Sequence, residues 1–307
     1  MVKTQKKTKT KMKKNNNGNN TMVCHPRMAM GNRANAGTCY NASMLTKIRD
    51  SHNERTKRRR DGRNKKPIFS NNVAEIVREL RQLYPNGEYS WLDILPVNDA
   101  NKSKYSKYFF SPKRPKQWTK NARTWLSNFD ILAILAQYEE VYLYFKFIGP
   151  SPIDFDDILE NKKVCVTQAL CGFKLQTHID NHVRKIGVVF NLDTHNEEGS
   201  HWVSMFIDID HRIIFYFDSL GDPIPPRIMK FVKRIVAEGE SIGTKMIYHS
   251  NVPRIHQKGN SECGMYSLYF IITMLTNSST MDKKIAYFKQ TRITDNFIFA
   301  LRDKYFN

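Results

Sequence analysis

The sequence predicts an α+β protein in which helices flank a central mixed sheet. Short β-branched and apolar runs, which are typical of strands, occupy residues 186–192, 201–209, 212–220 and 244–251. Apolar residues recur at helical spacing in residues 72–83, 225–240 and 263–275. The pair Asp210-His211 is expected to join two of the strands as a tight hairpin. Because strands and helices are mixed in this order, they are expected to build one body around a sheet.

The composition is that of a folded protein without a membrane segment. Apolar residues make up 40% of the 307 residues, with 18 Phe and 14 Tyr, which is enough for a sizeable core. No run approaches the roughly 18 apolar residues of a membrane span, and the amino terminus lacks an apolar secretory stretch. We therefore expect no membrane contact and no signal peptide, in a protein made in a cytosol.

Positive charge is concentrated at the amino-terminal end. Residues 1–66 carry 19 Lys or Arg and three acidic residues, so they hold +16 of the net charge of +20. We predict that residues 1–66 form a basic, largely disordered arm with a short helix at 38–53. Residues 67–120 then form a helical and loop-rich N-terminal extension, and residues 121–307 form the main domain.

The basic arm has two interpretations. A cationic segment of this density can bind nucleic acid through the phosphates, and without aromatic residues among the basic ones it should ignore base sequence. It can equally be a solubilising or targeting tail. Non-specific nucleic-acid contact through residues 1–66 therefore stands beside the tail as an open alternative.

The five cysteines are expected to be free thiols. Cys24, Cys39, Cys165, Cys171 and Cys263 are odd in number and widely scattered. A chain of this length does not need disulfides for stability, so we expect a reducing compartment.

One cluster of cysteines and histidines could suggest a metal. Cys165, Cys171, His178 and His182 have a wider cysteine gap, and a shorter distance between the pairs, than zinc fingers use. Cys171 also imitates a nucleophile followed by glycine, but no His–Asp pair stands upstream of it. We therefore expect no metal site, and we expect Cys171 to be structural.

Cys263 is the candidate nucleophile. It opens an apolar helix, so its thiol lies at the positive end of the helix macrodipole, which favours the thiolate. Gly264 beside it allows close approach of a backbone, and the preceding loop is polar. A small core residue is the alternative for Cys263, and this segment alone favours that alternative.

His201 and Asp218 are the candidate base and its orienting acid. A two-residue hairpin loop at 210–211 pairs Val203 with Asp218 and puts His201 on the same face of the sheet. As diagonal neighbours, an imidazole and a carboxylate can bridge the roughly 7–8 Å between their backbones. Asp208 falls on the opposite face, and His256 lacks an acid partner in the pattern.

Gln257 and Trp202 complete the candidate site. Gln257 is on the loop before Cys263, where its amide can donate to an oxyanion together with backbone N–H groups, although a loop glutamine is usually only solvated. Trp202, beside His201, can roof the approach to the thiol and narrow the channel, or it can be ordinary core packing.

The ordered set of His201-Trp202, Asp218, Gln257 and Cys263-Gly264 resembles the active-site signature of the adenain and SUMO-protease superfamily of cysteine peptidases. Three further segments resemble the thiol proteases of nucleocytoplasmic large DNA viruses: residues 39–48, 125–131 and 149–157. The resemblance implies that residues 121–307 are a cysteine protease domain with the catalytic cysteine at a helix N-terminus.

The resemblance also implies a substrate. It predicts an endopeptidase that cleaves after Gly-Gly or Gly-Xaa in viral structural precursors during virion maturation, in the virion and the host cytoplasm. The alternative within the superfamily is an isopeptidase for SUMO or another ubiquitin-like modifier. The alternative of another class is a nucleic-acid-binding packaging protein on an inactive protease fold. No cofactor is expected to be required, although DNA or a peptide could act as an activator.

Overall fold

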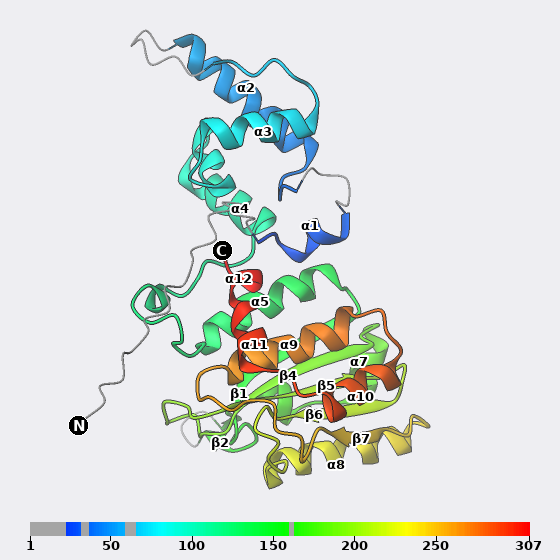
Figure 1. Cartoon of the computed structure of the whole chain (residues 1–307). Coiled ribbons are helices and arrows are strands. Elements are labelled where there is room, and N and C mark those ends of the chain that lie inside the picture. Colours follow the sequence, from blue (N-terminus) through cyan, green and yellow to red (C-terminus); the bar gives the residue numbers. More distant parts are fainter. Residues whose placement is uncertain (1–22, 32–36, 59–65, 160–162) are drawn as a thin grey trace, which may run out of the picture.

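The computed structural model describes residues 23–31, 37–58, 66–159 and 163–307. Figure 1 shows an amino-terminal lobe of helices and a larger lobe built around a sheet. The last helix, α12 (Arg302–Tyr305), lies where the two lobes meet. None of the helices in the described part of the chain combines the length and apolarity that crossing a membrane requires.

The central sheet is mixed, as predicted, and has the strand order β1-β4-β5-β6-β7. Its strands are β1 (Phe145–Pro152), β4 (Lys185–Asn191), β5 (Trp202–Asp208), β6 (Ile213–Phe217) and β7 (Ile247–Ser250). β4, β5 and β6 are antiparallel neighbours, whereas β1 and β7 run parallel to the strands beside them. The β-branched runs after residue 186 therefore form the middle of the sheet.

The register between β5 and β6 is the one that the two-residue hairpin predicts. Asp208 pairs with Ile213 and Ser204 pairs with Phe217. If this register is continued past the strand ends, His201 and Asp218 lie close together at the same end of the two central strands.

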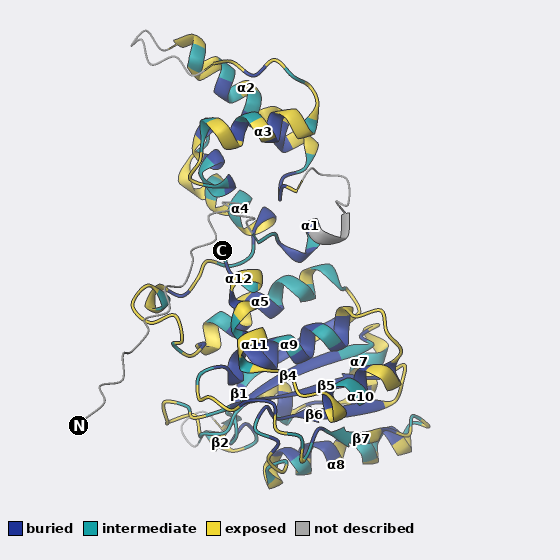
Figure 2. Cartoon of the chain, viewed as in Figure 1, coloured by how far each residue is buried: buried dark blue, intermediate teal, exposed yellow. Residues whose placement is uncertain are grey.

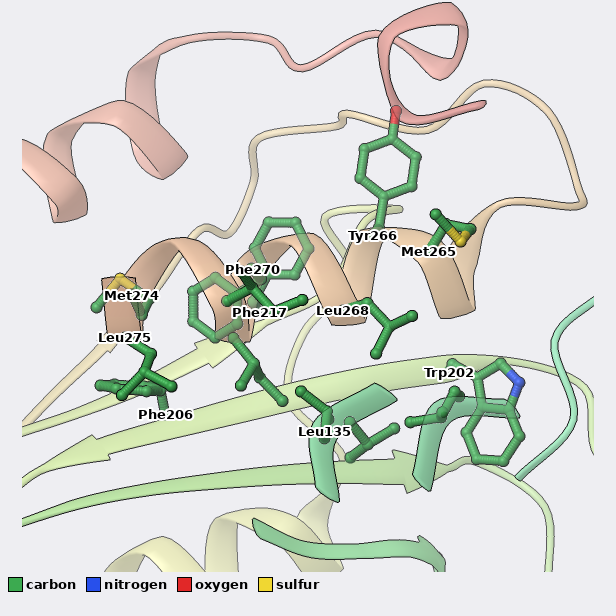
Figure 3. Packing of buried hydrophobic residues seen from close by; sticks show 14 of the residues in the cluster. Leu135, Trp202, Phe206, Phe217, Met265, Tyr266, Leu268, Phe270, Met274 and Leu275 are labelled. Carbon is green, nitrogen blue, oxygen red and sulfur yellow. The ribbon is translucent and has the colours of Figure 1, made fainter. Parts of the chain in front are cut away.

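Helices cover both faces of the sheet (Figure 1). α5 (Asn128–Val141) and α9 (Cys263–Thr276) pack on one face, and α8 (Pro226–Ser241) packs on the other. α9 is apolar on nearly all sides, so it is buried almost along its whole length, as Figure 2 shows in dark blue. Figure 3 shows Phe217 of β6 against Phe270 of α9, with ring centroids 4.7 Å apart. This packing fixes the helix that begins at Cys263 directly on the sheet.

The amino-terminal lobe has a hydrophobic cluster of its own. Its elements are α1 (Pro26–Gly31), α2 (Ala42–Arg58), α3 (Val73–Leu83), η1 (Glu88–Ile94) and α4 (Asp99–Phe109). Leu45 and Ile48 of α2 are fully buried in the same cluster as Ile68 and Leu80. Residues 37–58 are therefore folded, which corrects the expectation of a disordered arm through residue 66.

The predicted helix at 38–53 is present as α2, shifted toward the carboxyl end. Buried Glu88 anchors its entrance, since its carboxylate accepts hydrogen bonds from the Thr38 hydroxyl (2.7 Å) and the Cys39 N–H (3.0 Å). The lysine-rich residues 1–22 and the basic residues 59–65 lie outside the described residues.

β1 contains two prolines, Pro150 and Pro152. Residues 149–157 are rich in proline, yet Gly149 to Pro152 continue β1 with an irregular register between Ile148 and Ser151. β1 is at the edge of the sheet, where a proline without an N–H group is tolerated.

The remaining elements follow in chain order. They are η2 (Lys116–Thr119), β2 (Ile158–Leu159), β3 (Val164–Cys165), α6 (Gln168–Cys171), α7 (Leu175–Asp180), α10 (Met281–Gln290) and α11 (Asp295–Ala300). Asn307 joins the lobes: its side-chain oxygen accepts from the Val23 N–H (3.0 Å), and its backbone N–H donates to Pro112 O (2.8 Å).

Four of the cysteines are paired, so the expectation of free thiols is wrong for them. Cys24 forms a disulfide with Cys39, and Cys165 forms one with Cys171. Folding brings each pair together: Cys24 lies on a β-bridge to Phe110 beside the buried Cys39, and a short turn returns the chain from β3 to α6. Cys263 is free. The expectation of a reducing compartment therefore loses the support of free thiols. Cys165 and Cys171 are joined to each other, so they are not thiolates that could bind zinc.

Candidate active site

His201 and Asp218 form a hydrogen-bonded pair at the end of the central strands. His201 Nε2 lies 2.7 Å from Asp218 Oδ1, and the two side chains are 12% and 1% exposed. The pair exists because His201 directly precedes β5 and Asp218 directly follows β6. The contact that the hairpin register predicted is therefore present.

The same imidazole meets the thiol at the start of α9. Burial lowers the pKa of His201, but hydrogen bonds to Asp218 and Cys263 and the charges of both groups outweigh it and raise the pKa to about 10. Because Nε2 is taken by Asp218, Nδ1 is the ring nitrogen left for the thiol. The Cys263 residue is 2% exposed. An imidazole held between a carboxyl group and a thiol is the arrangement from which a thiolate–imidazolium pair forms.

Asn251 holds the backbone of Asp218 in place. Its side-chain oxygen accepts from the Asp218 N–H (3.0 Å), and its Nδ2 donates to Asp218 O (2.7 Å) and Arg254 O (3.0 Å). The Asp218 carboxylate also accepts from the Leu220 N–H at 2.9 Å. Sequence reasoning missed Asn251, because it lies on a loop after β7 and no motif marks it.

Gln257 is buried and held by its neighbours. Its Oε1 accepts from the Ser219 hydroxyl (2.9 Å), and one hydrogen of Nε2 goes to Gly259 O (2.7 Å). Its backbone N–H donates to Ser219 O at 2.8 Å. Ser219 directly follows Asp218, so the acid and the glutamine are fixed to the same short segment. The second hydrogen of Nε2 is used by no described residue.

Trp202 packs on the start of α9. Its indole N–H donates to Leu126 O at 3.1 Å, and the residue is 8% exposed. A Cβ on Gly264 would lie only 3.2 Å from its Cδ1 and 3.1 Å from Leu126 Cβ, so a larger residue there would force these neighbours to shift by a few tenths of an ångström. Figure 3 shows the indole at the sheet end beneath this turn of α9. Trp202 thus packs in the core against Gly264, the residue after Cys263.

A cavity of about 530 Å³ adjoins the loop that leads to Cys263. One side is formed by Asn260 and Ser261, and the other by the segment from Asn121 to Trp125. Trp125 is 40% exposed there. A larger cavity of about 760 Å³ lies between η1, α4 and α5, and none of the four candidate site residues lines it.

The competing histidine and acid have structural partners. His256 is fully buried, accepts from the Ile293 N–H (3.1 Å) and donates to Phe288 O (3.0 Å). Burial lowers its pKa to about 4, so it is neutral at pH 7. Asp208 bonds the backbone and ring of His211 at the hairpin, and Ile213 is its strand partner. Neither is joined to Cys263 by any described hydrogen bond.

Comparisons with known proteins support the same domain. Residues 181–307 match the Ulp1 protease family, C-terminal catalytic domain. The chain is 37% identical over 153 residues to a candidate thiol protease of Acanthamoeba polyphaga mimivirus, covering 50% of this chain and 48% of the mimivirus protein. It is 30% identical over 190 residues to a cysteine protease of African swine fever virus, covering 59% of this chain and 67% of that protease.

The chain therefore spans about half the length of the mimivirus relative. The crystal structure of an African swine fever virus protease superposes with a TM-score of 0.62 at 20% identity, covering 94% of this chain and 96% of that one. This likeness confirms the predicted α+β fold across both lobes. The family model matches residues 181–307, and two thirds of the African swine fever virus relative are covered at 30% identity. The chain therefore belongs to the Ulp1 protease family of cysteine proteases.

Proposed function

We propose that the protein is a thiol endopeptidase in which Cys263 is the nucleophile, His201 the base and Asp218 the orienting acid. One observation carries this proposal: a single imidazole is hydrogen-bonded both to Asp218, at 2.7 Å, and to the only free cysteine of the five. This is the nucleophile–base–acid arrangement that hydrolysis through an acyl-enzyme requires.

The reaction starts from the thiolate–imidazolium pair. The Cys263 sulfur attacks the carbonyl carbon of the scissile peptide, and the carbonyl oxygen becomes an oxyanion. The imidazolium of His201 gives its proton to the leaving amine, the C–N bond breaks and a thioester remains. Water then gives a proton to the imidazole and attacks the thioester, which releases the acid and restores the pair. Asp218 keeps the ring oriented through both proton transfers.

Gln257 is proposed to stabilise the oxyanion. The unused hydrogen of Nε2 and the first backbone N–H groups of α9 are the available donors. The bonds to Ser219 and Gly259 pre-orient this amide, so little reorganisation is needed during the reaction.

The proposed substrates are proteins cleaved after Gly-Gly or Gly-Xaa. Trp202 stands next to His201 in the chain, and we expect its indole to narrow the approach to the thiol, so that a residue without a side chain fits best next to the scissile bond. Since two relatives are viral, we favour structural precursors in a maturing virion, with the virion and host cytoplasm as the location. The chemistry as written uses no cofactor, and activation by DNA or a peptide is tested by adding either one.

Removal of SUMO or another ubiquitin-like modifier is the second candidate function. The family match favours it, because the family is the Ulp1 protease family and a relative from African swine fever virus is named a SUMO-1 cysteine protease. Parallel assays of Gly-Gly-Xaa precursor peptides and of SUMO or ubiquitin fusions separate the two. Faster cleavage of the fusions would replace the precursor assignment.

A nucleic-acid-binding packaging protein on an inactive fold is the alternative of another class. Its main support, the basic segments of residues 1–66, lies largely outside the described residues. Deleting residues 1–22 should leave proteolysis intact if the basic segment is accessory. DNA binding in a protein that cleaves no substrate would favour this alternative instead.

The direct experiment uses a Gly-Gly peptide that carries a carboxy-terminal electrophile. Mass spectrometry should locate its adduct on Cys263, and Cys263→Ala should lose both the adduct and peptide cleavage. Ser267→Ala, one turn further along buried α9, is the matched control and should retain both. Full cleavage by Cys263→Ala would refute the proposed nucleophile.

A further inference from the structure

The residue before the proposed nucleophile is a buried glutamate. Glu262 occupies the N-cap position of α9, but its side chain makes no capping hydrogen bond to the helix. Its carboxylate instead accepts from Arg302 Nε at 2.9 Å and from the Ser261 hydroxyl at 3.0 Å. The Arg302 side chain is 3% exposed and the Glu262 side chain is 1% exposed. A buried charge pair of this kind must be satisfied by further hydrogen bonds to be tolerated.

Arg302 makes those further bonds to two separate loops. Nη1 donates to Ala122 O (3.1 Å) and Thr124 O (2.9 Å), and Nη2 donates to Ser261 O (3.2 Å). The guanidinium also lies over the ring of Trp118, 4.3 Å from its centroid. One rigid side chain thus joins the loop that ends at Cys263 to the segment around residue 124.

These two loops are the two walls of the cavity of about 530 Å³ that adjoins the loop leading to Cys263. Thr124 lines one side and Ser261 lines the other, and Arg302 bonds a backbone carbonyl of each. The cavity width and the position of Cys263 therefore depend on the same guanidinium. The tight contact of Leu126 and Trp202 with Gly264 transmits any shift of one wall to the helix start.

A second charged residue from the same carboxy-terminal segment holds the other end of the loop. Asp295 accepts from the Lys258 N–H (3.0 Å), the Gly259 N–H (2.9 Å) and the Tyr266 hydroxyl (2.8 Å). In Figure 3 the Tyr266 hydroxyl points away from the sheet toward this segment. Residues 258–262 are therefore held by Asp295 of α11 and Arg302 of α12, whereas Gln257 is held by Ser219 beside β6 and Cys263 begins the helix that packs on the sheet.

We infer that Arg302, through its ion pair with Glu262, is a positioning residue that sets the Cys263 sulfur against His201 and fixes the cavity walls. The inference rests on the proposed function of Cys263. Arg302 is joined to neither His201 nor Cys263 by a described hydrogen bond. Because it acts by positioning the loop before Cys263, replacing Arg302 should change the reactivity of the thiol as well as the stability of the fold.

The experiment compares the full-length protein with Arg302→Met, Arg302→Lys and the double variant Glu262→Gln with Arg302→Met. The rate of Cys263 alkylation by iodoacetamide is followed from acid to alkaline pH, and cleavage of a Gly-Gly peptide gives kcat and KM. The double variant removes both charges of the pair, so it should recover the stability that Arg302→Met loses, since the buried carboxylate would keep only Arg123, whose Nη1 lies 3.9 Å from Glu262 Oε1. Arg234→Met is the matched control, because Arg234 bonds Leu170 and Cys171 carbonyls and stacks over Phe231 on the other face of the sheet.

The expected result is a loss of about 10- to 100-fold in kcat for Arg302→Met, the scale of a misplacement of about 1 Å. The pH dependence of Cys263 alkylation in Arg302→Met should differ from that of the wild-type protein. Arg302→Lys should recover only part of the kcat that Arg302→Met loses. The folded double variant should remain slow, whereas Arg234→Met should keep the wild-type profile. A stable double variant with wild-type kcat and alkylation profile would overturn the inference. If wild-type protein cleaves nothing, the proposed function fails, and the alkylation profiles still decide the role of Arg302.

Discussion

The two halves of the candidate active site are held in different ways. His201 and Asp218 stand at the ends of adjacent strands, so the register of the β5–β6 hairpin brings them together. Gln257 and Cys263 are joined by a loop, and that loop is held by Asp295 and Arg302 from the end of the chain. The base of a catalytic site can thus be positioned by local strand pairing, while the position of its nucleophile depends on packing with residues far away in the sequence.

Replacing the base should have the largest effect and test the sheet half. His201→Ala removes the group that holds the thiolate and protonates the leaving amine, so kcat should fall by about 10³–10⁴ or more. The circular dichroism spectrum should be unchanged, because His201 lies at the margin of the sheet. His256→Ala serves as the contrast, since His256 bonds only backbone groups and its loss should reduce stability first. If His256→Ala were the slower enzyme while folded, the assignment of the base would be wrong.

Removing the side-chain amide of the loop half should have the next largest effect. Gln257→Ala should lower kcat by about 10²–10³ with a smaller change in KM, because the amide acts on the oxyanion and not on the bound substrate. Ser219→Ala is the matched control: it removes a bond to Gln257 Oε1 but leaves the Nε2 donor, so a loss of about tenfold or less is expected. Equal losses in both variants would mean that Gln257 is structural.

The sheet half could be predicted from sequence, and the loop half only partly. Period-two alternation and a two-residue turn determine which residues of a hairpin share a face, so His201 and Asp218 follow from counting. No such rule connects Glu262, the residue before Cys263, to Arg302, 40 positions later, because that contact depends on how α11 and α12 pack. No helix was predicted in residues 277–307, so Asp295 and Arg302 were missed, and the role of Asn251 was missed at the end of a predicted strand.

The same difference between local sequence patterns and tertiary contacts explains the wrong predictions for the amino-terminal half of the chain. The helix of α2 was predicted from its local pattern, but its burial against Ile68 and Leu80 is a tertiary contact. Charge dominates the composition of residues 1–66, so the composition gave no indication that Leu45 and Ile48 of this helix are fully buried. Cysteine counting failed in a similar way, since the partners Cys24 and Cys39 are brought together by a bridge to residue 110.

Alkaline pH should disable the sheet half first. The pKa of His201 is raised from 6.5 to about 10, so the folded ring stays charged until about pH 10, whereas its contribution to stability is complete below about pH 6.5 and is lost as the pH rises from there through 10. Above about pH 10, kcat/KM should fall about tenfold per pH unit as the imidazolium loses its proton. A pH–rate profile with parallel circular dichroism separates this loss from unfolding. A decline centred near the ordinary histidine value of about 6.5 would show that Asp218 and Cys263 do not hold the proton on the ring.

Acid should weaken the loop half, and this is the smallest effect expected. The pKa of His256 is lowered to about 4 by burial, so its neutral form stabilises the fold above about pH 6.5, and this contribution is lost as the pH falls from there through 4. Protonation would break the bond that Nδ1 accepts from Ile293 N–H, next to the segment that carries Asp295. Between pH 7 and about pH 5.5 the free energy of unfolding should fall by about 1 kcal/mol from this group. His256→Asn, which does not titrate, should be less stable at pH 7 but show a flatter pH dependence in urea unfolding. An equal slope in both proteins would place the acid sensitivity elsewhere, and the loop half would then be as insensitive to acid as the strands that carry His201 and Asp218.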